Sequence, residues 1–187
     1  EYFGGDFERF IARETIQNSI DARIEDGDPR PAVAVEFELT KVPFKDLSGL
    51  DELYLRMKSC LERCRKTKDE KGIEFFNKAL DTLGKDKITV LRVSDYSTKG
   101  LVGGDMEEGG SWYKLVKAIG ENRMTGAGGG SFGIGKGAPF VASSLRTVYY
   151  SSLNLSGERI FQGRSRLITH EFEGEQKRGS GFFGVNG

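Results

Sequence analysis

The sequence feature that most constrains the fold is a long glycine-rich stretch from Gly100 to Gly130. A single helical pattern interrupts it, around Trp112 to Ile119. Loops of more than about 12 to 15 residues without structure of their own are uncommon in compact domains and are usually functional. We therefore predict a mobile, lid-like loop region over residues 96–130, with regular structure on both sides of it.

Helical and strand patterns alternate before and after this stretch. Alternating and β-branched runs predict strands over Ala32–Leu39, Lys87–Val93, Thr147–Leu153 and Arg159–Leu167. Apolar spacing predicts a helix over Asp6–Glu25, two helices over Asp46–Leu83 broken near Lys68–Lys71, and a helix start over Gly137–Ser144. The tail from Glu171 is predicted to be a loop.

The composition is that of an ordinary folded domain. With 187 residues, 37% of them hydrophobic and 30% charged, we expect one well-buried domain spanning residues 1–187. Lys plus Arg and Asp plus Glu both number 28, so no overall positive field points to nucleic acid or an anionic membrane. Because the chain starts with Glu1 and stops at Gly187 after a glycine-rich stretch, we expect a domain excised from a longer protein.

Cysteine and histidine are scarce. Cys60 and Cys64 are the only cysteines and His170 is the only histidine, whereas a closed zinc site needs four ligands. We expect two ordinary thiols and a reducing compartment. No apolar run approaches the ~20 residues that cross a bilayer, so we expect a cytoplasmic protein without a membrane partner.

The first predicted helix has one stripe that changes from apolar to polar. Residues at about 100° per position form this stripe as Phe7, Ile11, Glu14, Asn18 and Asp21. A second, apolar face is formed by Ala12, Ile16, Ile20 and Ile24. We expect the apolar face to pack and the polar stripe to line a wet pocket. The alternative is that Glu14, Asn18 and Asp21 face only solvent.

The pattern Glu-x-x-x-Asn-x-x-Asp-Ala is complete as Glu14, Asn18, Asp21 and Ala22. It resembles the first-helix motif of the GHKL, or Bergerat-fold, ATPases, which include MutL proteins, DNA gyrase B subunits and heat-shock chaperones. The resemblance implies that Glu14 is a general base for water and that Asn18 ligates Mg²⁺. It implies for Asp21 a supporting hydrogen bond behind the metal or beside the adenine.

A second motif follows the second predicted strand as Asp95-Tyr96-Ser97-Thr98-Lys99-Gly100. In the GHKL family an aspartate at this place accepts a hydrogen bond from the adenine amino group and begins a D-x-G-x-G pattern. Here Ser97 stands at the first glycine, and Gly100 is the second only if one residue is inserted. By this resemblance Asp95 reads the adenine and Gly100 lines the site. The alternative is that Asp95 is a turn former.

The third motif is a glycine-rich run before a predicted helix. Glycine lets backbone N–H groups approach phosphate oxygens, and a helix N-terminus adds positive potential. The run resembles the phosphate-binding segment of heat-shock-type chaperones and implies a nucleotide contact from each of its residues: Gly130, Ser131, Phe132, Gly133, Ile134, Gly135 and Lys136.

A P-loop is the rival interpretation of the same residues. Gly130 to Gly137 matches G-x-x-x-x-G-K-[ST] except that Gly137 replaces the hydroxyl residue, and no strand pattern precedes it. We therefore favour the GHKL interpretation. The family's late-strand threonine, which binds adenine through a water, has Thr147 and Ser180 as its candidates here.

Together the resemblance implies an α/β (α+β) two-layer sandwich with a mixed, mostly antiparallel sheet covered by helices on one face, the Bergerat ATP-binding fold. It implies ATP and Mg²⁺ as cofactors, slow hydrolysis, lid closure and ATP-dependent homodimerisation of a larger protein. DNA repair, remodelling and defence remain open as the process, with nucleic acid contacted by other domains. The alternatives are a nucleotide switch without hydrolysis and a histidine-kinase-type catalytic domain.

Overall fold

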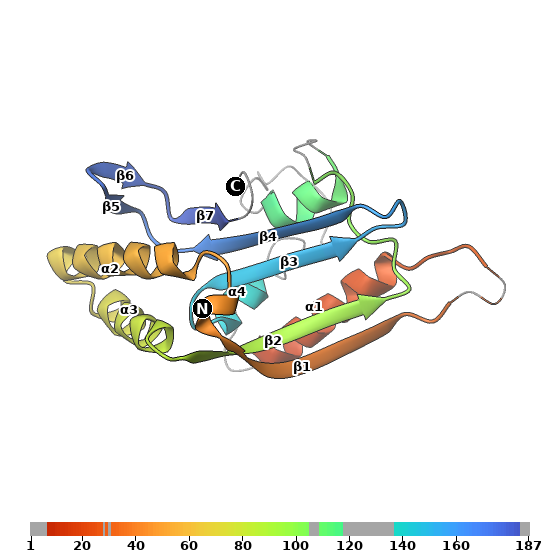
Figure 1. The fold of residues 1–187 in the computed structure, drawn as a ribbon, viewed down its shortest axis with the longest axis horizontal. Coiled ribbons are helices and arrows are strands. Elements are labelled where there is room, and N and C mark those ends of the chain that lie inside the picture. Colours follow the sequence, from red (N-terminus) through yellow and green to blue (C-terminus); the bar gives the residue numbers. More distant parts are fainter. Residues whose placement is uncertain (1–6, 28, 30, 105–108, 118–136, 184–187) are drawn as a thin grey trace, which may run out of the picture. The chain divides into compact units, whose positions relative to one another are not determined.

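The structure, a computed structural model, describes residues 7–27, 29, 31–104, 109–117 and 137–183 (Figure 1). The first half contains α1 (Phe7–Asp21), β1 (Ala34–Pro43), the 3₁₀ turn η1 (Phe44–Asp46), α2 (Leu50–Thr67), α3 (Glu70–Leu83) and β2 (Lys87–Tyr96). The second half contains the π-helical turn η2 (Tyr113–Lys117), α4 (Ala138–Ala142), β3 (Thr147–Leu153), β4 (Arg159–Arg166), β5 (His170–Phe172), β6 (Glu175–Lys177) and β7 (Ser180–Phe183).

The described strands form three small sheets. β1 pairs with β2, β4 lies between β3 and β7, and β5 pairs with β6. β4 and β7 are antiparallel, with Gly163 opposite Phe183 and Arg166 opposite Ser180. β5 and β6 are antiparallel as well, with His170 opposite Lys177. The chain is therefore a mixed α/β protein with small antiparallel sheets, where the resemblance implied a mixed, mostly antiparallel sheet.

Contacts within the chain divide it into two compact units. The first unit comprises the described residues of Glu1–Glu38, Arg92–Ala142 and Tyr150–Phe161. The second comprises Leu39–Leu91, Ser143–Tyr149 and the described residues of Gln162–Gly187. Helix α1 and Asp95 thus belong to the first unit, and the α2–α3 pair belongs to the second.

The core of the second unit is built on helices α2 and α3. Apolar residues recur at helical spacing on both helices and remove one face of each from water. Residue Asp69 separates the helices and caps the second, because its side chain accepts a hydrogen bond from the Gly72 N–H at 3.1 Å. The buried cluster consists of Leu50, Leu53, Met57, Cys60, Leu61, Cys64, Phe76, Ala79, Leu83, Ile88 and Leu145.

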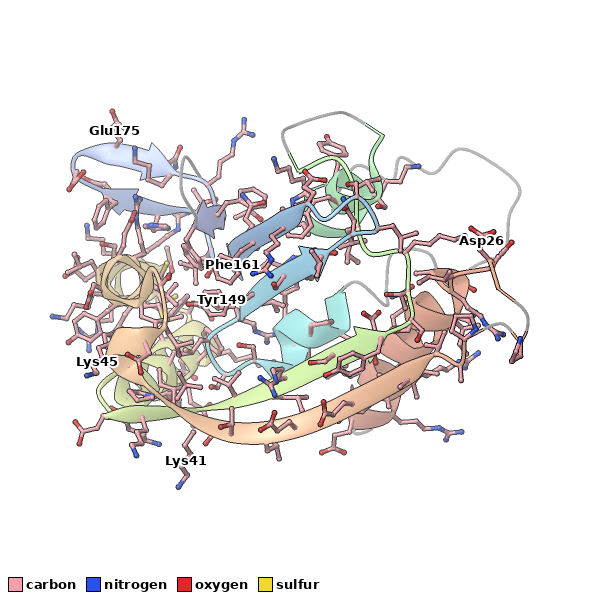
Figure 2. All side chains as sticks on the ribbon, turned by 45° about the vertical axis from the view of Figure 1, so that its right-hand side comes forward. Asp26, Lys41, Lys45, Tyr149, Phe161 and Glu175 are labelled. Carbon is pink, nitrogen blue, oxygen red and sulfur yellow. The ribbon has the colours of Figure 1, made fainter. Side chains whose placement is uncertain are left out.

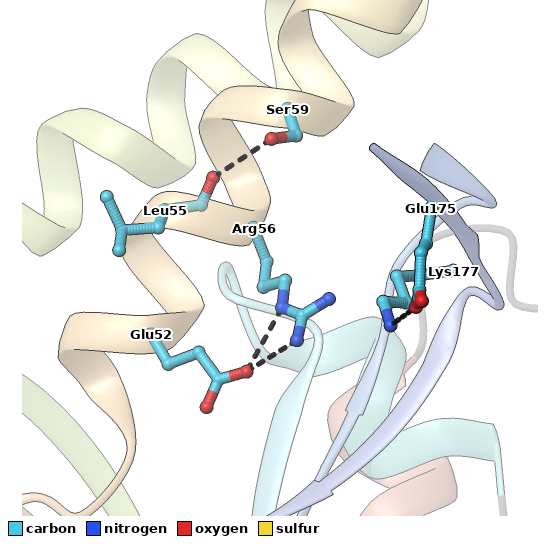
Figure 3. Close-up of polar contacts among 6 residues, drawn as sticks. All are labelled: Glu52, Leu55, Arg56, Ser59, Glu175 and Lys177. Atoms are coloured by element: carbon cyan, nitrogen blue, oxygen red, sulfur yellow. Dashed lines mark hydrogen bonds and ion pairs between the residues drawn. The ribbon is translucent and has the colours of Figure 1, made fainter. Parts of the chain in front are cut away.

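Polar contacts cover the exposed side of α2 (Figure 3). Arg56 forms an ion pair with Glu52 at 2.7 Å, one helical turn away, and its guanidinium lies 3.9 Å from the centre of the Phe172 ring. On the short hairpin of β5 and β6, Glu175 and Lys177 form a second ion pair. These exposed pairs contribute little to stability, so burial of the apolar cluster holds this unit together.

Four sequence predictions of the elements are confirmed in outline. The break between α2 and α3, at Lys68 and Asp69, lies inside the predicted Lys68–Lys71 segment. Strand β3 has the predicted bounds Thr147–Leu153. Strand β4 ends at Arg166, one residue before the prediction. Strand β2 begins at the predicted Lys87 but continues past the predicted Val93 to Tyr96, so Asp95 lies within the strand rather than after it.

The prediction of a loop after Glu171 is wrong. This tail contains part of β5 and all of β6 and β7. Strands of three or four residues are too short to show an alternating pattern, which is why the sequence analysis missed them. The signal that could have found them is Glu173-Gly174, a two-residue hairpin turn in which both φ angles are positive, at 52° and 76°.

The predicted packing face of α1 is also wrong. Ile16 and Ile20 are 40% and 51% exposed, whereas Ile11 and Ser19 are buried. The buried row can include hydroxyl side chains because each has a hydrogen-bond partner on the helix: the Thr15 hydroxyl donates to the Ile11 carbonyl at 2.7 Å, and the Ser19 hydroxyl lies 2.8 Å from the Thr15 carbonyl. Satisfied polar groups can be buried at low cost, so α1 packs by a smaller, more polar row than predicted.

Candidate functional site

Helix α1 positions the three polar residues of the first motif. Glu14 is half-buried, and Asn18 and Asp21 are exposed. The Gln17 side-chain amide donates a hydrogen bond to Asp21 Oδ1 at 2.8 Å. Because Ile11 is buried one turn before Glu14, the stripe passes from the interior to solvent along the helix.

The second motif lies directly beside this helix. Ser19 Oγ, 4% exposed, is 2.9 Å from Asp95 Oδ2 on β2. The Thr98 hydroxyl lies 3.4 Å from the other oxygen, Asp95 Oδ1, which is a long hydrogen bond. Asp95 itself is exposed. One oxygen of the carboxylate is therefore fixed from the buried side, while the residue as a whole remains open to solvent.

Backbone hydrogen bonds join the end of α1 to the segment after Asp95. The Ile24 N–H donates to the Ser97 carbonyl at 3.2 Å, and the Lys99 N–H donates to the Ala22 carbonyl at 2.7 Å. An isolated antiparallel bridge between Arg23 and Thr98 lies between them. The structure thus brings the first and second motifs together in one unit, although 76 residues separate Ser19 from Asp95 in sequence.

The backbone after Asp95 follows a left-handed course at two positions. Ser97 has a φ of 61° and Gly100 a φ of 68°. A Cβ at Gly100 would meet the Leu153 carbonyl oxygen at 2.5 Å, so both the backbone angle and the space require glycine there. Ser97 adopts the same region with a side chain, at the position where the family pattern has glycine.

The third motif cannot be compared with the structure. Residues 130–136, which include the predicted phosphate contacts Gly130 to Lys136, lie outside the described residues. The helix that follows them, α4, is described and packs against α1 in the same unit. Its residues Ala138 and Phe140 are buried, with 0% and 1% of their surface exposed.

Thr147 belongs to the second unit, apart from the first two motifs. Its hydroxyl lies 2.6 Å from the Ser165 hydroxyl and donates to the Leu145 carbonyl at 2.9 Å. Ser165 is 2% exposed. Ser180, the other late-strand candidate, pairs with Arg166 in the β4–β7 ladder. Both candidates therefore have a structural role within this unit.

Two surface hollows are found within the second unit. One, of about 510 Å³, lies between the end of α3 and η1 and includes Lys45, which is labelled in Figure 2. The other, of about 310 Å³, lies between α2 and the β5–β6 turn. Neither contains a sequence-predicted site residue. Both are lined by exposed basic and carboxylate side chains, which are in contact with solvent.

Burial raises the pKa of the Cys64 thiol in the second unit, and it raises two further pKa values there by a large amount. Desolvation raises the pKa of the Cys60 thiol to about 12, with the backbone hydrogen bond to Ile168 opposing it. Desolvation also raises the pKa of Tyr149 to about 12; this side chain is labelled in Figure 2 and donates to the Ser48 carbonyl at 2.7 Å. Both groups stay protonated at neutral pH, so neither is a nucleophile or base there.

The donor set at α1 suits a hard cation held together with a phosphate. Among the described residues, no cluster of three or more His, Cys, Asp or Glu side chains could hold a metal on its own. The exposed amide of Asn18 offers one oxygen, and Mg²⁺ typically takes one or two protein ligands, waters and substrate phosphate oxygens. Asn18 could therefore supply one oxygen to such a cation, which would need its other ligands from elsewhere.

The sequence analysis missed Ser19, which the structure places against Asp95. A signal was present: Ile11, Thr15 and Ser19 recur every four residues, which puts Ser19 on the buried edge of the motif-bearing stripe.

In the described part of the chain, no helix has both the length and the apolar character to span a membrane. Comparison of the chain with models of protein families, with curated proteins and with solved structures finds no match.

Proposed function

We propose that this chain binds ATP with Mg²⁺ in a Bergerat-type pocket between α1 and the segment after Asp95, and hydrolyses it slowly. The observation that carries the proposal is the Ser19–Asp95 contact, at 2.9 Å. It joins two motifs that the sequence resemblance assigned independently to the same nucleotide.

Each residue has a stated role. Glu14 orients and deprotonates the attacking water, and Asn18 with phosphate oxygens holds Mg²⁺, which supplies charge neutralisation at the phosphates. Asp95 accepts a hydrogen bond from the adenine amino group. Lid closure over the nucleotide and dimerisation of a larger protein would be the output of the cycle, and a DNA-linked process is the context that the MutL resemblance favours.

Two further observations support this assignment. Ser97 has a left-handed backbone, the region that glycine adopts most readily, at the position where the family pattern has glycine. Helix α4, which the glycine-rich run enters, packs on α1 in the same unit. Both arrangements are those that a pocket formed by the three motifs needs.

A nucleotide switch without hydrolysis is the second candidate. The observation in its favour is Ser97 itself, because a side chain in the left-handed region costs about 1 to 2 kcal/mol relative to glycine. A loop that keeps Ser97 at this cost in stability can bind the nucleotide without supporting its hydrolysis. The two candidates share the binding site and differ only in what Glu14 does.

The test is the melting temperature of the full chain with and without Mg-ATP, together with a steady-state assay of phosphate release. We expect millimolar Mg-ATP to raise the melting temperature of wild type, because a ligand that binds only the folded state stabilises it. Asp95→Ala should lose this shift. Glu14→Ala should keep the shift and lose turnover.

The exposed carboxylate Asp81, on α3 of the second unit, gives the matched control Asp81→Ala, which should keep both the shift and turnover. If wild type hydrolyses no ATP but is stabilised by it, the second candidate, a nucleotide switch without hydrolysis, is correct. If Mg-ATP shifts neither wild type nor the control, or shifts Asp95→Ala as much as wild type, the proposed pocket is wrong.

A further inference from the structure

The Asp95 carboxylate presents two different oxygens. Oδ2 is 2.9 Å from the hydroxyl of Ser19, a side chain that is only 4% exposed. Among the described residues, Oδ1 has only the long contact of 3.4 Å to the Thr98 hydroxyl. A carboxylate accepts hydrogen bonds and donates none. The buried donor therefore occupies one oxygen and leaves the other as the stronger acceptor for an incoming group.

Ser19 is itself held in place. Its hydroxyl carries a single proton and lies within hydrogen-bond distance of two acceptors, the Thr15 carbonyl at 2.8 Å and Asp95 Oδ2 at 2.9 Å. Both acceptors belong to regular structure, since Thr15 is on α1 and Asp95 on β2. The hydroxyl is thus fixed between a helix and a strand, and the direction of the carboxylate is set by the backbone rather than by solvent.

A carboxylate held by one oxygen distinguishes between purine bases. Adenine offers one amino group next to a ring nitrogen that only accepts, so a second free carboxylate oxygen beside that nitrogen would be repelled. Guanine offers two adjacent donors, its N1–H and its 2-amino group, which match a carboxylate that presents both oxygens. Hydrogen bonds to charged groups of this kind are the strong ones and carry geometric specificity.

We infer that Ser19 is a positioning residue that turns Asp95 Oδ2 inward and so makes the site select an adenine over a guanine nucleotide. The inference rests on the proposed function, because it assumes that Asp95 faces the base. It goes beyond that function in assigning the selectivity to a buried serine outside the predicted set of site residues.

The experiment measures the dissociation constants of Mg-ATP and Mg-GTP for the full chain. Wild type should prefer ATP. Ser19→Ala should weaken ATP binding about tenfold and weaken GTP binding less or not at all, because a hydrogen bond to a charged group is lost while the second oxygen is released. The ATP-to-GTP preference should therefore fall. Ser19→Thr, which keeps the hydroxyl, should retain the preference.

Ser59→Ala is the matched control, since Ser59 is also a helical serine whose hydroxyl bonds back one turn, to Leu55 at 3.4 Å (Figure 3). It should leave both constants unchanged. A purely structural role for Ser19 would weaken both nucleotides equally, and an unchanged ratio in Ser19→Ala would therefore overturn the inference. If Ser19→Ala does not fold, Ser19→Cys replaces it, with the same expected fall because a thiol is a weak donor.

The failure of the inference can be told from the failure of the proposed function. A wild-type chain that binds neither nucleotide contradicts both. A wild-type chain that prefers ATP, with the same preference in Ser19→Ala, contradicts only the role of Ser19.

Discussion

Gly100 lies so close to Leu153 that a Cβ on Gly100 would stand 2.5 Å from the Leu153 carbonyl oxygen. Two hydrogen bonds hold the same approach: the Leu101 N–H donates to Ser152 Oγ at 2.8 Å, and the Leu155 N–H donates to the Lys99 carbonyl at 3.3 Å. The segment that leaves Asp95 is thereby fixed to the hairpin of β3 and β4. The sequence analysis assigned Gly100 to nucleotide binding, and the structure gives it this packing role as well.

Gly100→Ala should therefore destabilise the protein strongly. A left-handed backbone with a side chain costs about 1 to 2 kcal/mol, and the contact with Leu153 adds to it, so we expect a loss above about 2 kcal/mol in urea unfolding. Gly157→Ala is the matched control. Gly157 also has a positive φ, of 82°, but nothing lies within 4 Å of its Cβ position. Equal losses in the two variants would show that the close approach to Leu153 has no energetic weight.

Met57→Ala should open a cavity in the core of the second unit. Met57 is 0% exposed within the α2–α3 cluster, and such truncations cost about 2 to 5 kcal/mol. Leu55→Ala, two residues away on the same helix, should cost about 0.5 kcal/mol because Leu55 is 50% exposed. Chemical unfolding of both variants checks the difference. A similar loss in both would contradict the described face of α2.

Thr147→Val should separate a structural from a binding role of this hydroxyl. Removing it leaves the Ser165 hydroxyl buried without its 2.6 Å partner, which should cost about 1 to 3 kcal/mol. Adding Ser165→Ala should recover part of the loss, because both polar groups are then gone. If Thr147 also contacts the nucleotide, ATP affinity will stay reduced in the double variant. Unchanged ATP affinity in both would leave Thr147 with a purely structural role.

Stability should fall at alkaline pH. Burial raises the pKa of Cys60 from 9.0 and that of Tyr149 from 10.0, each to about 12. Above the unfolded pKa values the unfolded chain releases protons that the folded chain retains, so this stability is full below about pH 9 and is lost as the pH rises toward about 12. The loss should not exceed about 1.4 kcal/mol per pH unit for each group.

Urea unfolding between pH 8 and about 10.5 measures this slope. Cys60→Ala should flatten it between about pH 9 and 10, where the unfolded thiol titrates first. The two proteins differ only at residue 60, so the comparison with wild type isolates the thiol. An identical slope in both proteins would contradict the raised pKa of Cys60.

The sequence by itself determined most of the local structure. Apolar residues at helical spacing specified α2 and α3, and Asp69, able to cap a helix through its side chain, marked the point between them. β-branched alternation specified β3 to the residue. These features depend on neighbours within a few positions, so a single sequence carries them. The motif residues on α1 lie on one stripe for the same reason, since spacings of four and three residues share a face of any helix.

Only the tertiary structure decided which groups meet. The choice of Ser19 rather than Ile16 or Ile20 as the buried side of α1 depends on a partner 76 residues away, Asp95, whose position no local pattern contains. The short strands β6 and β7 form because β5 and β4 pair with them. Gly100 must be glycine because Leu153 lies against it. Helix spacing is set within one turn, whereas long-range burial and hydrogen bonding are set by the whole chain.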